Sequence, residues 1–206
     1  MRFFLKILLR GFFKFRVHGS ENLPQEGPIV LVSNHVSYMD PIVVGVAVSR
    51  PLRYMAKEEL FGGFSGRVLK ALGAFPVKRA GMDKMAIRKA LKLLSEGDAL
   101  LVFPEGTRGN GVKLGQVKDG VGMIICKSNV PAIPVVISGT EKALPRGSRW
   151  PKRCLIEVRF GSLIHAGCKS DICRKREKYN VVTKEIMSVM EKMVEESSRT
   201  AIMGVH

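Results

Sequence analysis

Short apolar runs alternate with segments of helical periodicity along most of the chain, and this alternation constrains the fold more than any other feature. The apolar runs predict strands over residues 29–33, 52–56, 75–78, 100–103, 133–138 and 155–160. The periodic segments predict helices over 41–49, 58–72, 83–95 and 119–127, and a last amphipathic helix over 178–197. Apolar strands that alternate with helices indicate an α/β domain, with a mainly parallel or mixed sheet flanked by helices.

The first 17 residues combine regularly spaced cations with large apolar side chains. Arg2, Lys6, Arg10 and Lys14 recur every fourth residue, and no apolar run between them exceeds three residues. Because a spanning helix needs about 20 apolar residues, this segment does not predict one. It predicts an amphipathic membrane-surface helix over 1–17, followed by a single domain over 18–206 that ends in a helix. The alternative is a helix that packs onto the domain's own core.

The charge of the chain is strongly unbalanced. Lys and Arg number 34 against 18 Asp and Glu, a formal net charge of +16. Small soluble domains usually carry a net charge of about 2–8 in magnitude, so the excess predicts a polyanionic partner: nucleic acid, an anionic membrane or a phosphorylated substrate. The chain has no nucleic-acid-binding motif or interleaved surface aromatics, so a nucleic-acid partner is not expected. The alternative is a basic surface that only aids solubility.

The cysteines favour a reducing compartment. Cys126, Cys154, Cys168 and Cys173 form no C-x-x-C pair, and no histidine stands near them at the spacing of zinc ligands. This pattern predicts neither a metal site nor a disulfide framework, and it favours the cytoplasmic side of the membrane.

The first candidate catalytic residues follow the predicted strand 29–33. Asp40 before Pro41 is typical of a helix start, with Asp40 as the N-cap. A turn between strand and helix can bring His35 and Asp40 into contact. A carboxylate bonded to one imidazole nitrogen leaves the other free to accept a proton, so the pair can act as a general base. Taken alone, the two residues favour an ordinary reading, in which His35 is a loop histidine and Asp40 only a helix cap.

Two further clusters follow predicted strands, at the edge of the sheet where α/β folds place their sites. After strand 100–103 come Glu105, Gly106 and Arg108; Arg108 offers paired donors to a phosphate, and Gly106 lets the backbone approach a substrate closely. Strand 75–78 ends in Lys78, and a second cation, Arg79, follows directly. For the cluster after strand 100–103, the alternative is a surface turn with a salt bridge.

Together these strings resemble the sequence blocks of the 1-acylglycerol-3-phosphate acyltransferase family, also called lysophosphatidic acid acyltransferases. The N-H-x-x-x-x-D block is present as Asn34, His35 and Asp40, and the F-P-E-G-T-R block over residues 103–108. A block that ends in an arginine matches residues 73–79, and a proline-containing block matches 130–135. The similarity runs from about residue 19 to 164 in the family's order, with Pro76 as a departure inside the third block.

The resemblance implies transfer of a fatty acyl group from acyl-CoA or acyl-carrier protein to the 2-hydroxyl of lysophosphatidic acid, which yields phosphatidic acid for phospholipid biosynthesis. His35 would remove the hydroxyl proton, and Asp40 would orient the imidazole. The implied substrate-binding residues are Lys78, Arg79, Glu105, Gly106, Thr107 and Arg108. The resemblance implies no metal and no bound cofactor.

The expected partners are lysophosphatidic acid, an acyl thioester, which could be carried by acyl-carrier protein, and an anionic membrane surface. The expected location is peripheral or monotopic, on the cytoplasmic face of the membrane. Two alternatives remain open at this point. The same chemistry could act on another lysophospholipid or an aminoacyl lipid, and a non-catalytic basic protein could bind membranes without any reaction.

Overall fold

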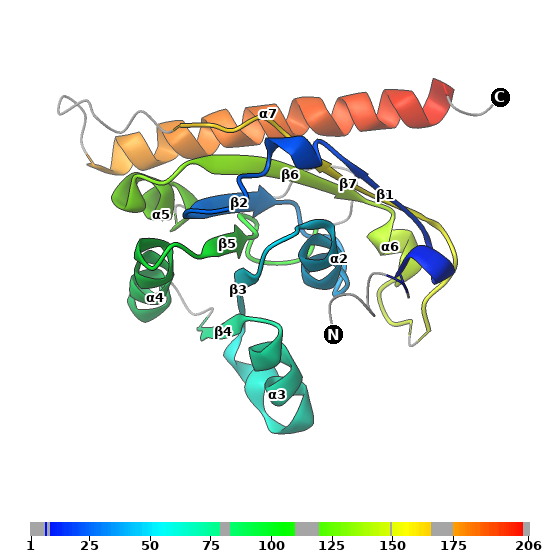
Figure 1. The fold of residues 1–206 in the computed structure, drawn as a ribbon, viewed down its shortest axis with the longest axis horizontal. Helices are drawn as coiled ribbons and strands as arrows, with labels where there is room; N and C mark the ends of the chain where they lie inside the picture. The colour runs from blue at the N-terminus through cyan, green and yellow to red at the C-terminus, as the bar shows by residue number, and fades with distance from the viewer. Residues whose placement is uncertain are drawn as a thin grey trace.

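A mixed sheet forms the centre of the computed structural model, which describes residues 7, 9–78, 83–109, 120–148, 150–165 and 175–203. Within these residues the sheet has seven strands in the order β1-β7-β6-β2-β5-β3-β4 (Figure 1). All neighbours are parallel except β6 and β7, so the mainly parallel or mixed sheet is confirmed. The strands are β1 (Lys14–His18), β2 (Ile29–Ser33), β3 (Leu52–Lys57), β4 (Ala74–Val77), β5 (Ala99–Val102), β6 (Ala132–Ser138) and β7 (Leu155–Phe160).

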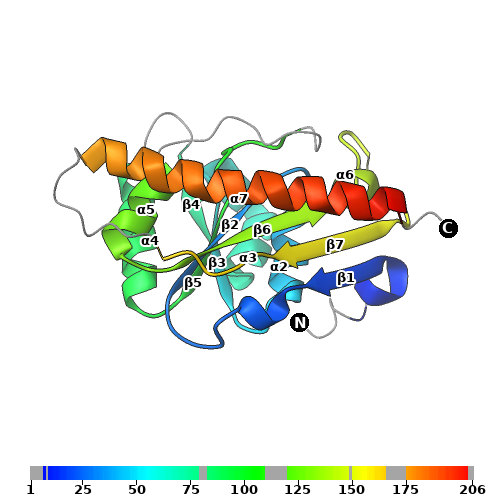
Figure 2. The same ribbon diagram turned by 90° about the horizontal axis from the view of Figure 1, so that it is seen from above.

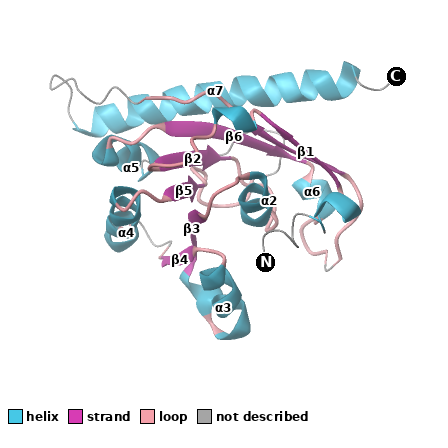
Figure 3. Cartoon of the chain, viewed as in Figure 1, coloured by secondary structure: helices cyan, strands magenta, loops and turns pink. Residues whose placement is uncertain are grey.

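Helices cover both faces of the sheet (Figure 3). The helices are α2 (Asp40–Ala47), α3 (Gly63–Ala71), α4 (Lys84–Ser95), α5 (Gly120–Ser128), α6 (Thr140–Ala143) and α7 (Lys175–Met203), with short 3-10 helices η1 (Ser20–Asn22) and η2 (Glu58–Phe61). Helices α4, α5 and α7 pack on one face, and α2 packs on the other. Figure 2 shows α7 lying along the sheet over β6.

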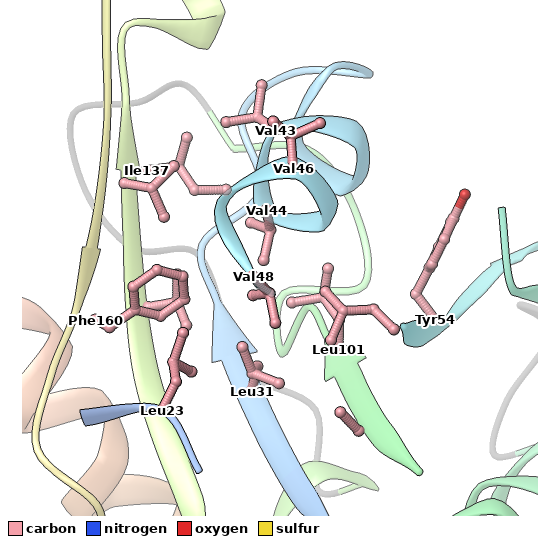
Figure 4. Packing of buried hydrophobic residues seen from close by; sticks show 14 of the residues in the cluster. Leu23, Leu31, Val43, Val44, Val46, Val48, Tyr54, Leu101, Ile137 and Phe160 are labelled. Atoms are coloured by element: carbon pink, nitrogen blue, oxygen red, sulfur yellow. The ribbon is translucent and has the colours of Figure 1, made fainter. Parts of the chain in front are cut away.

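The central strand β2 is buried on both sides because its side chains alternate between two cores. Val30 and Val32 belong to the core beneath α4, α5 and α7, whereas Leu31 belongs to the core beneath α2. Figure 4 shows Val44 and Val48 directed toward Leu31 and its neighbours in this second core. The lack of a polar face in this apolar run therefore correctly predicted a strand that is buried on both faces.

The six predicted strands are confirmed as β2 to β7, with ends that differ by no more than one residue. Pro76 lies in β4, the edge strand, where a residue without an N–H is tolerated. The continuous helix predicted over 58–72 is wrong, because Gly62 is extended and separates η2 from α3. The C-terminal helix is confirmed, and α7 extends beyond both predicted ends.

The helix predicted over residues 1–17 is wrong at its C-terminal end. Residues 9–12 are helical, but β1 begins at Lys14 and pairs in parallel with β7. The four-residue spacing of cations hides a two-residue alternation in β1, where Phe15 and Val17 are half-buried between exposed neighbours. Leu9 and Phe13 are buried in the core, whereas Phe12 is exposed. Packing onto the domain's own core is therefore part of what this segment does; residues 1–6 and 8 lie outside the described residues.

Among the residues that the structure describes, no helix combines the length and the hydropathy that a membrane crossing requires.

Candidate active site

Segments far apart in the sequence meet at the carboxyl edge of the three neighbouring strands β6, β2 and β5. His35 follows β2, the loop with Phe103 follows β5, and Thr140 follows β6. This edge is where parallel α/β sheets place their functional residues. The sequence clusters predicted separately are thereby brought to one place.

The side chains of His35 and Asp40 are in direct contact, as predicted. His35 Nδ1 lies 2.8 Å from Asp40 Oδ2. Asp40 is fully buried, and the His35 side chain retains 12% exposure. A carboxylate accepts a hydrogen bond, so Nδ1 carries the proton and Nε2 is the nitrogen that can accept one.

Asp40 is held by more than the imidazole. Its Oδ2 also accepts hydrogen bonds from the backbone N–H groups of Val36 (2.6 Å) and Ser37 (2.8 Å). The expected role of Asp40 as N-cap is wrong, since Met39 is the N-cap and Asp40 is the first residue of α2. The carboxylate turns back over residues 35–37 instead of capping the helix, because the turn offers it three donors within reach. This arrangement fixes both the carboxylate and the imidazole bonded to it.

Thr140 completes the set of donors around Asp40, and the sequence analysis missed it. Its Oγ1 donates a 2.6 Å hydrogen bond to Asp40 Oδ1, and both side chains are fully buried. Gly139, which precedes it, has φ +89°, and a Cβ there would collide with the carbonyl oxygen of Leu155. Glycine is therefore required for the turn that leads into Thr140. The available signal was a Gly-Thr pair directly after a predicted strand.

The backbone of His35 is anchored by the loop after β5. Glu105 Oε1 accepts a 3.0 Å hydrogen bond from the His35 N–H, and the Gly109 N–H donates to the His35 carbonyl oxygen at 2.7 Å. The Phe103 ring stacks on the imidazole, with 4.3 Å between ring centroids. Glu105 is buried and is not among the described residues that line the adjacent cavity. Its carboxylate therefore supports the position of His35.

Asn34 joins the ends of two strands. Its Nδ2 donates to the Ile137 carbonyl oxygen at 2.9 Å, and its Oδ1 accepts from the Ile137 N–H at 2.8 Å. A side-chain amide that satisfies both backbone groups of one residue extends the β2–β6 pairing beyond the strand. It fixes the start of the turn that carries His35.

An open cavity of about 1390 Å³ lies beside the pair, and His35 is one of the residues that line it. Most of its wall is apolar and comes from β3, α3, β4, α4 and α5, with Leu69, Val77 and Ile124 as examples. Tyr54 also lines it, and burial raises the pKa of its hydroxyl to about 12, so this group stays neutral. A mostly apolar cavity that reaches an imidazole suits a molecule with a hydrocarbon chain and one reactive polar end.

Cationic side chains line the polar end of this cavity. The Arg108 guanidinium carbon lies 3.7 Å from the centroid of the Tyr38 ring, so the two groups stack. Arg146 Nη2 donates to the carbonyl oxygens of Arg108 (2.6 Å) and Gly109 (2.9 Å). Tyr38 and Arg146 were not predicted as site residues. Tyr38 thereby holds the Arg108 side chain, and Arg146 holds its backbone.

The other predicted substrate-binding residues divide into two groups. Lys78, Gly106 and Thr107 line the same cavity as Arg108, whereas Arg79 lies outside the described residues. The backbone N–H of Lys78 donates to Asp83 Oδ2 at 2.8 Å. Hydrogen bonds from the backbone N–H groups of Lys78, Ala86 and Met85 lower the pKa of Asp83.

In the part of the chain that the structure describes, no three His, Cys, Asp or Glu side chains lie close enough together to hold a metal ion.

Comparison with known proteins identifies the family of the chain. Residues 14–138 match the family described as Acyltransferase. A chloroplastic 1-acyl-sn-glycerol-3-phosphate acyltransferase from Arabidopsis thaliana is 32% identical over 148 residues, which are 69% of this chain and 41% of that protein. A 1-acyl-sn-glycerol-3-phosphate acyltransferase from Bacillus subtilis is 28% identical over 194 residues, covering 92% of this chain and 96% of that protein.

The fold also matches a solved structure. The crystal structure of the 1-acyl-sn-glycerophosphate acyltransferase PlsC from Thermotoga maritima superposes with a TM-score of 0.76 at 26% sequence identity. The match covers 96% of this chain and 79% of that one. The chain thus spans less than half the length of the chloroplastic relative but nearly all of the Bacillus protein.

Proposed function

This chain belongs to the Acyltransferase family, and from that premise we propose that it transfers a fatty acyl group from a thioester to the 2-hydroxyl of lysophosphatidic acid, which yields phosphatidic acid for phospholipid biosynthesis. The names of its relatives in plants and bacteria support this acceptor. The observation that carries the proposal is the contact of His35 with buried Asp40, at 2.8 Å, beside a mostly apolar cavity with Arg108 at its polar end.

The reaction needs a base, because an alcohol is a weak nucleophile until its proton is removed. His35 Nε2 accepts the proton of the acceptor's 2-hydroxyl while the oxygen attacks the thioester carbonyl. Asp40 keeps Nδ1 protonated and stabilises the imidazolium that forms. The tetrahedral intermediate then collapses, the carbon–sulfur bond breaks, and the thiolate takes the proton from Nε2. The base is regenerated, and no covalent enzyme intermediate is required.

The cavity divides the substrates by their chemistry. The apolar wall holds an acyl chain, and Arg108 and Lys78, which line the cavity, bind the acceptor phosphate. Arg79, the next residue along the chain, is proposed as a further phosphate contact. Gly106 and Thr107 also line the cavity and position the glycerol backbone. The donor is acyl-CoA or acyl-carrier protein.

Two buried residues position the catalytic pair without contacting substrate. Glu105 holds the His35 backbone, and Thr140 holds the Asp40 carboxylate. Both side chains are buried, so loss of either hydrogen bond leaves a polar group without a partner.

The protein acts at an anionic membrane surface, as a peripheral protein on the cytoplasmic face. The net charge of +16 and the exposed apolar side chains Ile7 and Phe12 in the N-terminal segment support this location. An acceptor that is itself an amphiphile requires access to a membrane.

The test is product identification with purified protein. An acyl-CoA is mixed in parallel with lysophosphatidic acid, lysophosphatidylglycerol and lysophosphatidylcholine, thiol release is followed, and the lipid product is identified by mass spectrometry. We expect phosphatidic acid to form fastest, with His35→Ala as the inactive control. Faster acylation of another acceptor would replace lysophosphatidic acid in the proposal. Thioester consumption that does not depend on His35 would contradict the proposed enzyme altogether.

A further inference from the structure

Three exposed apolar side chains form a rim at the cavity, on η2 and α3. Leu60, Phe64 and Val68 are spaced four residues apart and are 41%, 75% and 38% exposed. All three also line the cavity, so they mark a place where it opens to the surface. Figure 1 shows α3 projecting away from the sheet beyond the edge strand β4. An apolar cluster at the mouth of an apolar cavity indicates a docking surface more than a chance exposure.

The charges around this rim indicate what it docks to. Helix α3 carries Arg67 and Lys70 and no acidic residue, and the Arg67 guanidinium carbon lies 6.0 Å from the centroid of the Phe64 ring. Among the described residues, the acids next to the rim along the chain are Glu58 and Glu59 of η2, and Glu59 also lines the cavity. Large apolar side chains flanked by cations are what a protein presents to the boundary between acyl chains and anionic headgroups.

We propose that the η2–α3 rim, defined as Leu60, Phe64, Arg67, Val68 and Lys70, is the surface through which this protein docks onto an anionic lipid bilayer. The apolar side chains enter the acyl region and the two cations contact headgroups. The cavity then opens directly to the bilayer, and a lipid chain passes along Phe64 and Val68 toward His35 without crossing water. This inference rests on the proposed function, because only a lipid substrate needs such a path.

A matched control lies on the opposite side of the molecule. The exposed fraction of Val181 on α7 is 64%, comparable to the 75% of Phe64. Unlike Phe64, Val181 has charged neighbours of both signs one helical turn away: Glu177, Lys178, Lys184 and Glu185. Helix α7 covers the other face of the sheet from α2, and Figure 1 places α7 and α3 at opposite sides of the fold. A single apolar side chain among mixed charges is not a membrane contact.

The experiment uses tryptophan fluorescence. The chain has one tryptophan, Trp150, which is 81% exposed, so Trp150→Phe removes all tryptophan fluorescence from this chain. Phe64→Trp or Val181→Trp is added, and each protein is mixed with phosphatidylcholine vesicles that contain about a third phosphatidylglycerol and brominated acyl chains. We expect a blue shift and strong quenching for Phe64→Trp and neither for Val181→Trp. In sedimentation, Phe64→Gln should bind vesicles several-fold more weakly, and Val181→Gln should bind like the parent.

Four outcomes would overturn the docking surface. Three are vesicle binding without quenching at position 64, equal quenching at both positions, and no vesicle binding at all. The fourth is a blue shift at position 64 before vesicles are added, since a second copy would then cover the rim. Acyl transfer by the unsubstituted protein in detergent micelles tests the proposed function separately. An active enzyme without quenching at position 64 loses only the docking surface, and an inactive protein with that quenching loses only the proposed function.

Discussion

The turn over residues 34–40, which carries the proposed catalytic pair, and the η2–α3 rim border the same cavity but are built in opposite ways. In the turn, Asp40 is fully buried and accepts hydrogen bonds from two backbone groups, one imidazole and Thr140. In the rim, Phe64 is 75% exposed, and the Arg67 guanidinium lies above its ring. Buried polar networks hold atoms at fixed distances, whereas exposed apolar side chains gain from meeting another apolar phase. The protein thus fixes the two groups proposed to react, whereas the proposed entry of the substrate depends on an exposed surface.

The largest effect should come from removing the imidazole. We expect His35→Ala to lower kcat about 1000-fold, because general-base catalysis contributes about 100- to 10,000-fold. Tm should change little, since the side chain borders a cavity. Thiol release measures kcat, and thermal unfolding measures Tm. His18→Ala is the matched control. His18 also contacts a carboxylate, with Nε2 3.2 Å from Oε1 of Glu157, but His18 does not line the cavity. A His35→Ala enzyme with a tenth of the parent activity would refute the base.

Removing the Arg108 guanidinium, the proposed contact to the substrate phosphate, should weaken binding of the acceptor. We expect Arg108→Ala to raise KM for lysophosphatidic acid about 30-fold, because a charged hydrogen bond contributes about 1.5–3 kcal/mol. The kcat should stay within a few-fold of the parent, since the pair His35–Asp40 is untouched. Arg153→Ala is the control, because Arg153 also lies over an aromatic ring, that of Phe12, and does not line the cavity. An unchanged KM in steady-state kinetics would count against the phosphate role.

Loosening the buried network should have a smaller effect on turnover. We expect Thr140→Val to lower kcat about 10-fold with KM unchanged, because one hydrogen bond of about 1.4 kcal/mol that orients Asp40 is lost. Thr140→Ser keeps the hydroxyl and should restore most of kcat. The control is Thr183→Val, which removes a buried hydroxyl bonded to the Tyr179 carbonyl oxygen on α7. Equal kcat for the valine and serine variants would show that Thr140 does not position the carboxylate.

The smallest effect concerns the stability of the cavity wall. Asp83 caps α4 by accepting from the N–H groups of Met85 and Ala86, so Asp83→Ala should lower the free energy of unfolding by about 1 kcal/mol at pH 7. The pKa of Asp83 is lowered by its hydrogen bonds to backbone N–H groups. Its contribution is therefore full above the ordinary pKa of 3.8 and is lost as the pH falls through the lowered value. Urea unfolding should show a smaller difference in the free energy of unfolding between the parent and Asp83→Ala at pH 3 than at pH 7. The same difference at both pH values would contradict the role of Asp83 as a cap.

Prediction from sequence succeeded where local chemistry and tertiary environment agree. The buried strands were found because both of their faces are apolar, and the contact of His35 with Asp40 was found because both lie within one turn. It failed at β1, where regular cations concealed a strand whose partner, β7, begins 141 residues later along the chain, from Lys14 to Leu155. It also failed at Gly62, which interrupts a helix that periodicity alone would continue.

The sequence by itself determined the alternation of strands and helices, the excess of cations, and the residue types needed for a proton acceptor and a phosphate ligand. Only the tertiary structure decided which of these act together. Thr140 reaches Asp40 across 100 residues, Glu105 turns to the His35 backbone, and Arg146 reaches the loop that carries Arg108. The physical reason is that a parallel sheet brings the ends of distant strands to one edge, and a hydrogen bond formed there depends on distance in space.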